Sequence, residues 1–72
     1  MTLAEASLKE TYVIKAIHSD DDDELKAFLF SLGCYSGEAI TVISRRRNNC
    51  VIALKDGRYN IDQQLAQAII VE

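Results

Sequence analysis

The fold of this 72-residue chain is decided between positions 20 and 37, where the sequence reads DDDDELKAFLFSLGCYSG. Apolar side chains recur there at the spacing i, i+3, i+4 and i+7, which places them on one face of an α-helix. Acidic residues precede this stripe and Gly33 follows it, as is typical of the start and the end of a helix. The buried face of the predicted helix consists of Leu25, Phe28, Leu29 and Leu32.

Both ends of this helix carry residues with a strong positional preference. Asp21 and Glu24 are three residues apart, the spacing of a capping box, in which two side chains bind the first free backbone N–H groups. Gly33 is expected to take the left-handed conformation that ends a helix, with Cys34 making an apolar contact just beyond it. Ser36-Gly37 then fits the centre of a type II turn, which needs positive φ at its third position.

Short segments with the composition of β-strands surround the helix. The segment Thr11–His18 is rich in β-branched and aromatic residues, and a bulge would place both Ile14 and Ile17 on its buried face. Asp56-Gly57 between two short apolar runs is a strong hairpin signal. Further strands are expected at residues 39–45, 50–55, 58–61 and 68–71, with one helical turn at 63–67.

This order of elements predicts a mainly β protein with one helix, placed between the first and second strands. Five short strands around one core favour a small closed barrel, because closure removes the exposed strand edges that promote aggregation. Residues 1–72 suffice for one domain of this kind, since so short a chain buries only about 60% of its unfolded surface.

Composition narrows the functional classes. The net charge of −3 disfavours nucleic-acid binding, because an acidic surface repels phosphates. No apolar run approaches the ~18 residues of a membrane span, and residues 1–10 lack the order of a signal peptide. Two cysteines are too few for a disulfide framework. We therefore expect a cytoplasmic protein with reduced thiols and no direct insertion into a membrane.

Metal or catalytic chemistry has few candidate residues. The acidic residues 20–24 point in diverging directions around a helix start, so we interpret them as capping rather than as an ion site. The weak metal candidates are His18, Cys34 and Cys50, which include no C-x-x-C pair. Since the one histidine has no recognisable nucleophile or phosphate-binding motif beside it, we expect no enzyme, no catalytic residues and no resident cofactor.

A surface for a protein partner is the remaining candidate site. Phe30 falls off the apolar stripe, so its ring is expected at or near solvent, and Tyr35 follows the helix end. Together they would form an apolar patch that docks a partner or a second copy of the chain. The alternative is simple packing of Phe30 against the amino-terminal segment.

Two other features suit contact with a protein. The consecutive residues Arg45, Arg46 and Arg47 form a basic hairpin tip, which matches an acidic protein surface better than a nucleic acid, given the acidic chain as a whole. The strand at 58–61 or the closing strand offers an edge to which a partner's strand could add.

Several short motifs, spread over roughly residues 3–71, occur in an order that one known family shares. They are Leu32-Gly33-Cys34, Gly37, Ile40, Val42, Ala66, Ile69 and Val71. This pattern resembles the FeoA family, ferrous iron transport protein A, in which a helix ending in Leu-Gly precedes a turn glycine, a hairpin and a closing Ala-x-x-Ile-x-Val. Two positions depart from it: Lys9-Glu10 where the family usually has a glycine, and Ser36 where it often has a proline.

The resemblance implies an SH3-like barrel and a cytosolic accessory protein of ferrous iron uptake. Such a protein would act by contact with the cytosolic domain of FeoB, a membrane transporter with a GTP-binding domain. The resemblance brings no catalytic residue, and contact with Fe²⁺ or another divalent metal would be transient. The alternative is a metal-binding or metal-sensing regulatory module, because a similar barrel forms the carboxyl-terminal domain of iron-dependent repressors.

Overall fold

The computed structural model describes all 72 residues and contains five β-strands, two α-helices and one short 3-10 helix. In chain order the elements are the 3-10 helix η1 (Leu3–Glu5), β1 (Thr11–Ile17), α1 (Asp23–Leu32), β2 (Ala39–Arg45), β3 (Asn49–Leu54), β4 (Gly57–Asp62), α2 (Gln63–Ala68) and β5 (Ile69–Val71). The mainly β character and the placement of a helix between the first two strands agree with the sequence. The helical turn expected after the fourth strand is the second helix, α2.

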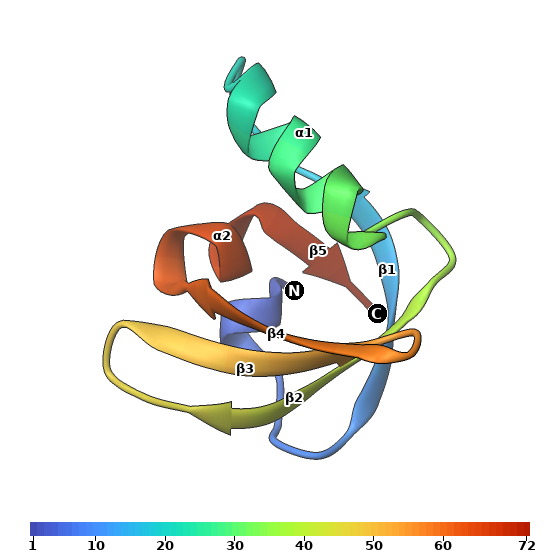
Figure 1. Cartoon of the computed structure of the whole chain (residues 1–72), viewed down its shortest axis with the longest axis vertical. Coiled ribbons are helices and arrows are strands. Elements are labelled where there is room, and N and C mark those ends of the chain that lie inside the picture. The colour runs from blue at the N-terminus through green and yellow to red at the C-terminus, as the bar shows by residue number, and fades with distance from the viewer.

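The five strands form one antiparallel sheet in the order β4-β3-β2-β1-β5. Because β4 and β5 are the two ends of this order and do not pair, the sheet is not closed by hydrogen bonds, and the predicted closure of the barrel is wrong. The chain passes from β4 to β5 through α2. Figure 1 shows β2, β3 and β4 below, with α2 and β5 above β4.

The bulge expected in the first strand is confirmed. Pairing between β1 and β5 shifts register between Ile14 and Ala16, so that Ile14 is fully buried while Ile17 is half-buried. A second shift, between Val42 and Ser44, interrupts the pairing of β2 with β3. Such irregularities bend strands, and here they let a small sheet curve around its core.

The core is a cluster of 15 buried side chains, all of them apolar. It consists of Leu3, Ala6, Ile14, Leu29, Cys34, Ile40, Val42, Cys50, Ile52, Leu54, Ile61, Ala66, Ala68, Ile69 and Val71. The strands supply most of these residues, since alternate positions of β2 and β3 point inward. α1 supplies only Leu29.

The buried face of α1 is narrower than its apolar stripe. Leu25 and Leu32 are half-buried beside the core, whereas Phe28 is 47% exposed, so its predicted burial is wrong. α1 projects away from the sheet in Figure 1, and its contact with the body runs along the line of Leu29. Phe28 lies about 100° around the helix from Leu29, which places its ring beside that line rather than under the helix.

The ends of α1 are fixed by a side-chain cap and a left-handed glycine. The Leu25 N–H donates to Asp22 Oδ1 at 3.0 Å, so the cap is Asp22 and the predicted cap at Asp21 is wrong by one residue. Asp21 instead takes a left-handed conformation with φ of 68°. At the other end Gly33 has φ of 100° and Cys34 is fully buried, as expected.

The turn between β3 and β4 is shifted by one residue from its predicted position. Leu54 pairs with Gly57, so the turn residues are Lys55 and Asp56 rather than Asp56 and Gly57. Lys55 carries the positive φ of 57° that the turn requires at its first position. Gly57 is the first residue of β4.

The amino-terminal segment is held against the sheet by Arg45, at the end of β2. The guanidinium Nη2 of Arg45 donates to the carbonyl oxygens of Leu3 at 3.3 Å and Ala6 at 2.8 Å. Leu3 is fully buried, whereas Leu8 is 46% exposed, because η1 ends at Glu5 and no helical face continues to Leu8.

The anchoring role of Arg45 can be tested by truncation. Arg45→Ala removes the donor to two backbone carbonyls, and we expect the free energy of unfolding to fall by about 1–3 kcal/mol. Urea denaturation followed by circular dichroism measures this change. Arg46→Ala removes the same charge from the exposed neighbouring residue, and we expect it to change stability by less than about 0.5 kcal/mol. Equal effects of the two substitutions would contradict the anchor.

Candidate functional surface

Two aromatic rings from either side of the helix end stack on one another. The ring centroids of Phe30 and Tyr35 are 5.4 Å apart, with an angle of 19° between the ring planes. The left-handed Gly33 reverses the chain after α1, and the burial of Cys34 holds that reversal against the core. Tyr35 thereby returns beside the last turn of α1, so the structure brings together the two aromatic residues that the sequence analysis singled out.

Two lysines flank this pair of rings. Lys26 Nζ lies 5.8 Å from the centroid of Phe30, and Lys55 Nζ lies 5.6 Å from the centroid of Tyr35. Both distances allow a cation–π attraction. Lys55 also lies 3.7 Å from a carboxylate oxygen of Glu38. We call Lys26, Phe30, Tyr35 and Lys55 the aromatic stack.

Exposure within the aromatic stack differs between its rings. Tyr35 is 48% exposed, whereas Phe30 is half-buried and supports it. Neither lysine was predicted as part of this surface. The position of Lys26 could have been predicted, because Lys26 precedes Phe30 by four residues on the same helix and such residues lie side by side. Lys55 belongs to a distant turn, and only the fold places it beside Tyr35.

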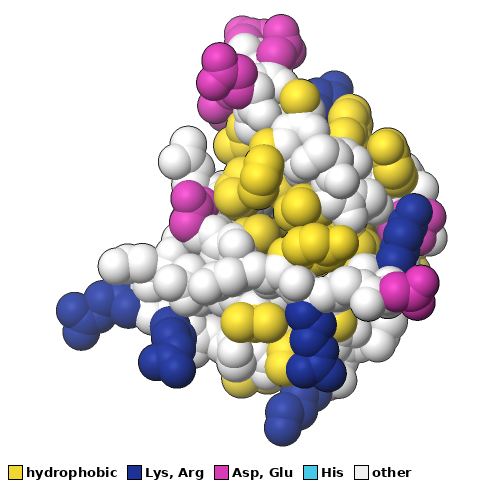
Figure 2. Space-filling view, in the orientation of Figure 1, with side chains coloured by type: hydrophobic (Ala, Val, Ile, Leu, Met, Phe, Trp, Pro, Cys, Tyr) yellow, Lys and Arg dark blue, Asp and Glu magenta, His cyan; other side chains and the backbone are white.

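Hydrophobic side chains also gather around α1 on the face that Figure 2 shows, between the helix and β4. Four partly buried apolar residues from three elements pack on the core: Leu25 and Leu32 of α1, Tyr59 of β4 and Leu65 of α2. Because α1 buries only Leu29 completely, most of its remaining surface is accessible. The helix is therefore the largest element available for contact with another protein.

One acidic group and one basic group of side chains lie at different ends of the molecule. Figure 2 shows acidic side chains at the top, over the start of α1, and basic ones at the far left, by the turn between β2 and β3. Arg46 and Arg47 are exposed in that turn. Lys55 lies in the turn at the other end of β3, so these residues do not form one basic patch.

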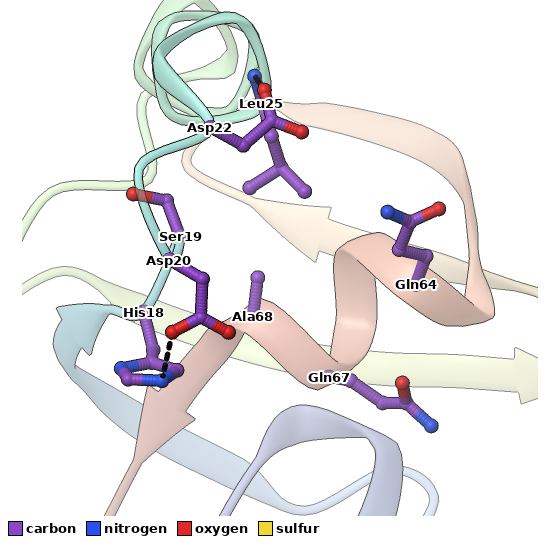
Figure 3. A pocket seen from close by; sticks show the side chains of 8 residues that line it. All are labelled: His18, Ser19, Asp20, Asp22, Leu25, Gln64, Gln67 and Ala68. Carbon is purple, nitrogen blue, oxygen red and sulfur yellow. Dashed lines mark hydrogen bonds and ion pairs between the residues drawn. The ribbon is translucent and has the colours of Figure 1, made fainter.

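A hollow of about 320 Å³ lies between the end of β1, the start of α1 and one face of α2. Figure 3 shows its lining residues, which are His18, Ser19, Asp20, Asp22, Leu25, Gln64, Gln67 and Ala68. His18 Nε2 lies 3.0 Å from Asp20 Oδ1, and both side chains are largely exposed, at 68% and 84%. Asp22 is engaged in capping α1.

The three weak metal candidates do not meet in the structure. Cys34 and Cys50 are buried in the core as free thiols, whereas His18 is on the surface. Burial raises the pKa of the Cys34 thiol to about 11 and also raises the pKa of Cys50, partly offset by Arg45. Nowhere do three His, Cys, Asp or Glu side chains gather in a way that could hold an ion. His18 and Asp20 supply two ligands, fewer than the three or four protein ligands of zinc sites.

No helix of this chain is both long enough and apolar enough to cross a membrane. The largest helix, α1, has 10 residues and carries Asp, Glu and Lys.

The fold is similar to several solved structures. The FeoA protein of Stenotrophomonas maltophilia, a prokaryotic SH3-domain protein solved in complex with zinc, is 20% identical with a TM-score of 0.90, covering 100% of this chain and 89% of that one. A FeoA-like protein from Clostridium acetobutylicum is 16% identical with a TM-score of 0.87, covering 100% and 84%. A manganese-dependent transcriptional repressor is 23% identical with a TM-score of 0.89, but the match spans 99% of this chain and only 40% of the repressor. At these identities the similarity establishes an SH3-like fold.

Sequence comparison identifies the family. No curated protein sequence matches the chain. The model of the FeoA domain, however, matches residues 1–72, which is the whole length described here. The motifs around Gly33, Gly37 and the closing strand occupy the positions that the resemblance assigned to them. The chain therefore belongs to the FeoA family, which is linked to ferrous iron transport.

Proposed function

We propose that this protein is a non-enzymatic, cytosolic accessory of ferrous iron uptake that acts by contact with the cytosolic domain of a FeoB-type transporter. Its membership of the FeoA family supports the connection with iron transport. The FeoA family is not a known enzyme family, which supports a role without chemistry of its own. Contact would tune the nucleotide-binding domain of the transporter or its assembly.

The aromatic stack is the observation that carries this proposal. An interface gains most of its energy from a few aromatic and basic residues near its centre. Tyr35 presents half of its surface to solvent, and its orientation is already fixed by Phe30. A ring held in place loses little conformational entropy on binding. The two lysines at its margins favour a partner surface that is apolar in the middle and acidic at its rim.

The basic tip offers a second contact for the same partner. Arg46 and Arg47 are exposed, while Arg45 is engaged with the amino-terminal segment. Charges at the rim of an interface mainly raise the association rate, and salt screens their effect. In this proposal Arg46 and Arg47 attract an acidic partner and direct it toward the aromatic stack.

Truncation of Tyr35 tests the proposed contact directly. Tyr35→Ser removes the exposed ring and leaves Phe30 to pack on the helix end. We expect the affinity for the soluble cytosolic domain of the transporter to fall at least about tenfold, as for a moderate hot-spot residue. Calorimetric titration, carried out with and without guanine nucleotide, measures the affinity.

The matched control is Leu8→Ser. Leu8 is 46% exposed, nearly the same as Tyr35, and it belongs to the loop between η1 and β1. This loop lies at the bottom of Figure 1, away from α1. We expect this variant to bind like the original protein. Unchanged binding of Tyr35→Ser, with circular dichroism showing an intact fold, would contradict the proposed surface.

A metal-binding or metal-sensing module is the second candidate function. The proximity of His18 Nε2 to Asp20 Oδ1 in the lining of the hollow favours it, as does the zinc bound by the related FeoA structure. Only two potential ligands meet there, so we expect no stoichiometric metal binding that depends on His18. Equilibrium dialysis of the original protein and of His18→Ala with Fe²⁺ or Zn²⁺ measures this binding. Stoichiometric binding lost in His18→Ala would support the metal module instead.

A further inference from the structure

The two edge strands of the sheet, β5 and β4, differ in whether another segment of the chain covers their outer side. The outer side of β5 is covered by the amino terminus, since Thr2 forms a bridge with Ile70 and the Val71 N–H donates to the Met1 carbonyl at 2.9 Å. On the other side, β4 pairs with β3 alone. One edge of the sheet is therefore closed by the chain itself, and the other is left open.

Hydrogen-bond alternation identifies the open groups of β4. The pair Leu54–Gly57 flanks a two-residue turn, and such a pair exchanges hydrogen bonds within its own hairpin. Bonded pairs then recur at every second residue of β4, which leaves the backbone groups of Arg58 and Asn60 pointing away from β3. Neither residue takes part in any backbone hydrogen bond outside the helices and the sheet. The side chains of Arg58, Asn60 and Asp62 are exposed as well.

The sequence of this edge is complementary to itself. Residues 58–62 read Arg-Tyr-Asn-Ile-Asp. When two copies run antiparallel with Asn60 opposite Asn60, Arg58 of one copy faces Asp62 of the other, and Tyr59 faces Ile61. Opposite charges then pair on one face and apolar side chains on the other, the combination that stabilises neighbouring antiparallel strands.

We propose that a second copy of this chain adds to β4, so that two sheets join edge to edge about a two-fold axis through Asn60. The contact is isologous and closed, because each copy offers the same strand to the other. An edge of about five residues buries little surface, so the association is weak and depends on concentration. This self-association involves a surface other than the aromatic stack and does not depend on the proposed contact with a transporter.

Sedimentation equilibrium at concentrations up to about 1 mM tests this proposal, a range that covers interfaces of low affinity. We expect a monomer–dimer equilibrium that Arg58→Glu weakens at least tenfold, because the new carboxylate faces Asp62 of the other copy. Lys15→Glu makes the same change of charge at an exposed position on β1 and should leave the dimer unchanged. Asn60→Pro removes an outward N–H without touching the ladder with β3, and it should abolish the dimer while circular dichroism shows a retained fold.

Cross-linking tests the register. In a hydrogen-bonded antiparallel pair the Cα atoms are about 5.5 Å apart, which is within the range that a disulfide bridges. Asn60→Cys should therefore form a disulfide-linked dimer under mild oxidation much faster than Lys15→Cys, and the buried Cys34 and Cys50 should not compete. If the protein is monomeric at every concentration, the proposal is overturned. The charges of Arg58 and Asp62 would then serve to prevent pairing at this edge. A dimer indifferent to Arg58→Glu and Asn60→Pro would overturn it as well.

Discussion

The reversal of the chain at Gly33 couples the core of this protein to its candidate surface. Gly33 ends α1 in a left-handed conformation, with φ of 100°, and a residue with a Cβ would pay about 1–2 kcal/mol for the same geometry. Immediately after it, Cys34 enters the core and fixes the direction of the chain. The next residue, Tyr35, consequently lies on Phe30. A single backbone requirement thus positions the helix, a core residue and the aromatic stack.

The distribution of apolar residues is the reason that the proposed function is assigned to the surface. A curved sheet with η1 and α2 encloses nearly all the buried aliphatic side chains, and α1 contributes only Leu29. No charged or polar side chain is buried, and the two buried thiols, Cys34 and Cys50, have pKa values that burial raises. The charged and polar side chains that could recognise a partner therefore lie on the surface, on α1, on the turns and on the open edge of β4.

Element boundaries were predicted well where a residue type has one preferred conformation, such as glycine at a helix end. They were predicted less well where several neighbouring residues suit the same position equally. Gly33 fixed the end of α1, and the limits of β2 were correct, but four consecutive aspartates gave no means of choosing Asp22 as the cap. Periodicity alone placed Phe28 in the core, because the width of the contact face depends on how far α1 stands from the sheet. Lys55, which lies beside Tyr35, and the carbonyl groups that Arg45 binds come from distant segments, so only the fold could supply them.

Mapping the contact residue by residue tests the central claim most directly. In a titration of the isotopically labelled protein with the soluble cytosolic domain of the transporter, backbone amide shifts report which residues the partner touches. We expect the largest changes at Lys26, Phe30, Tyr35 and Lys55, with smaller ones at Arg46 and Arg47. Changes centred on His18 and the hollow beside it, or no changes at saturating partner, would contradict the account.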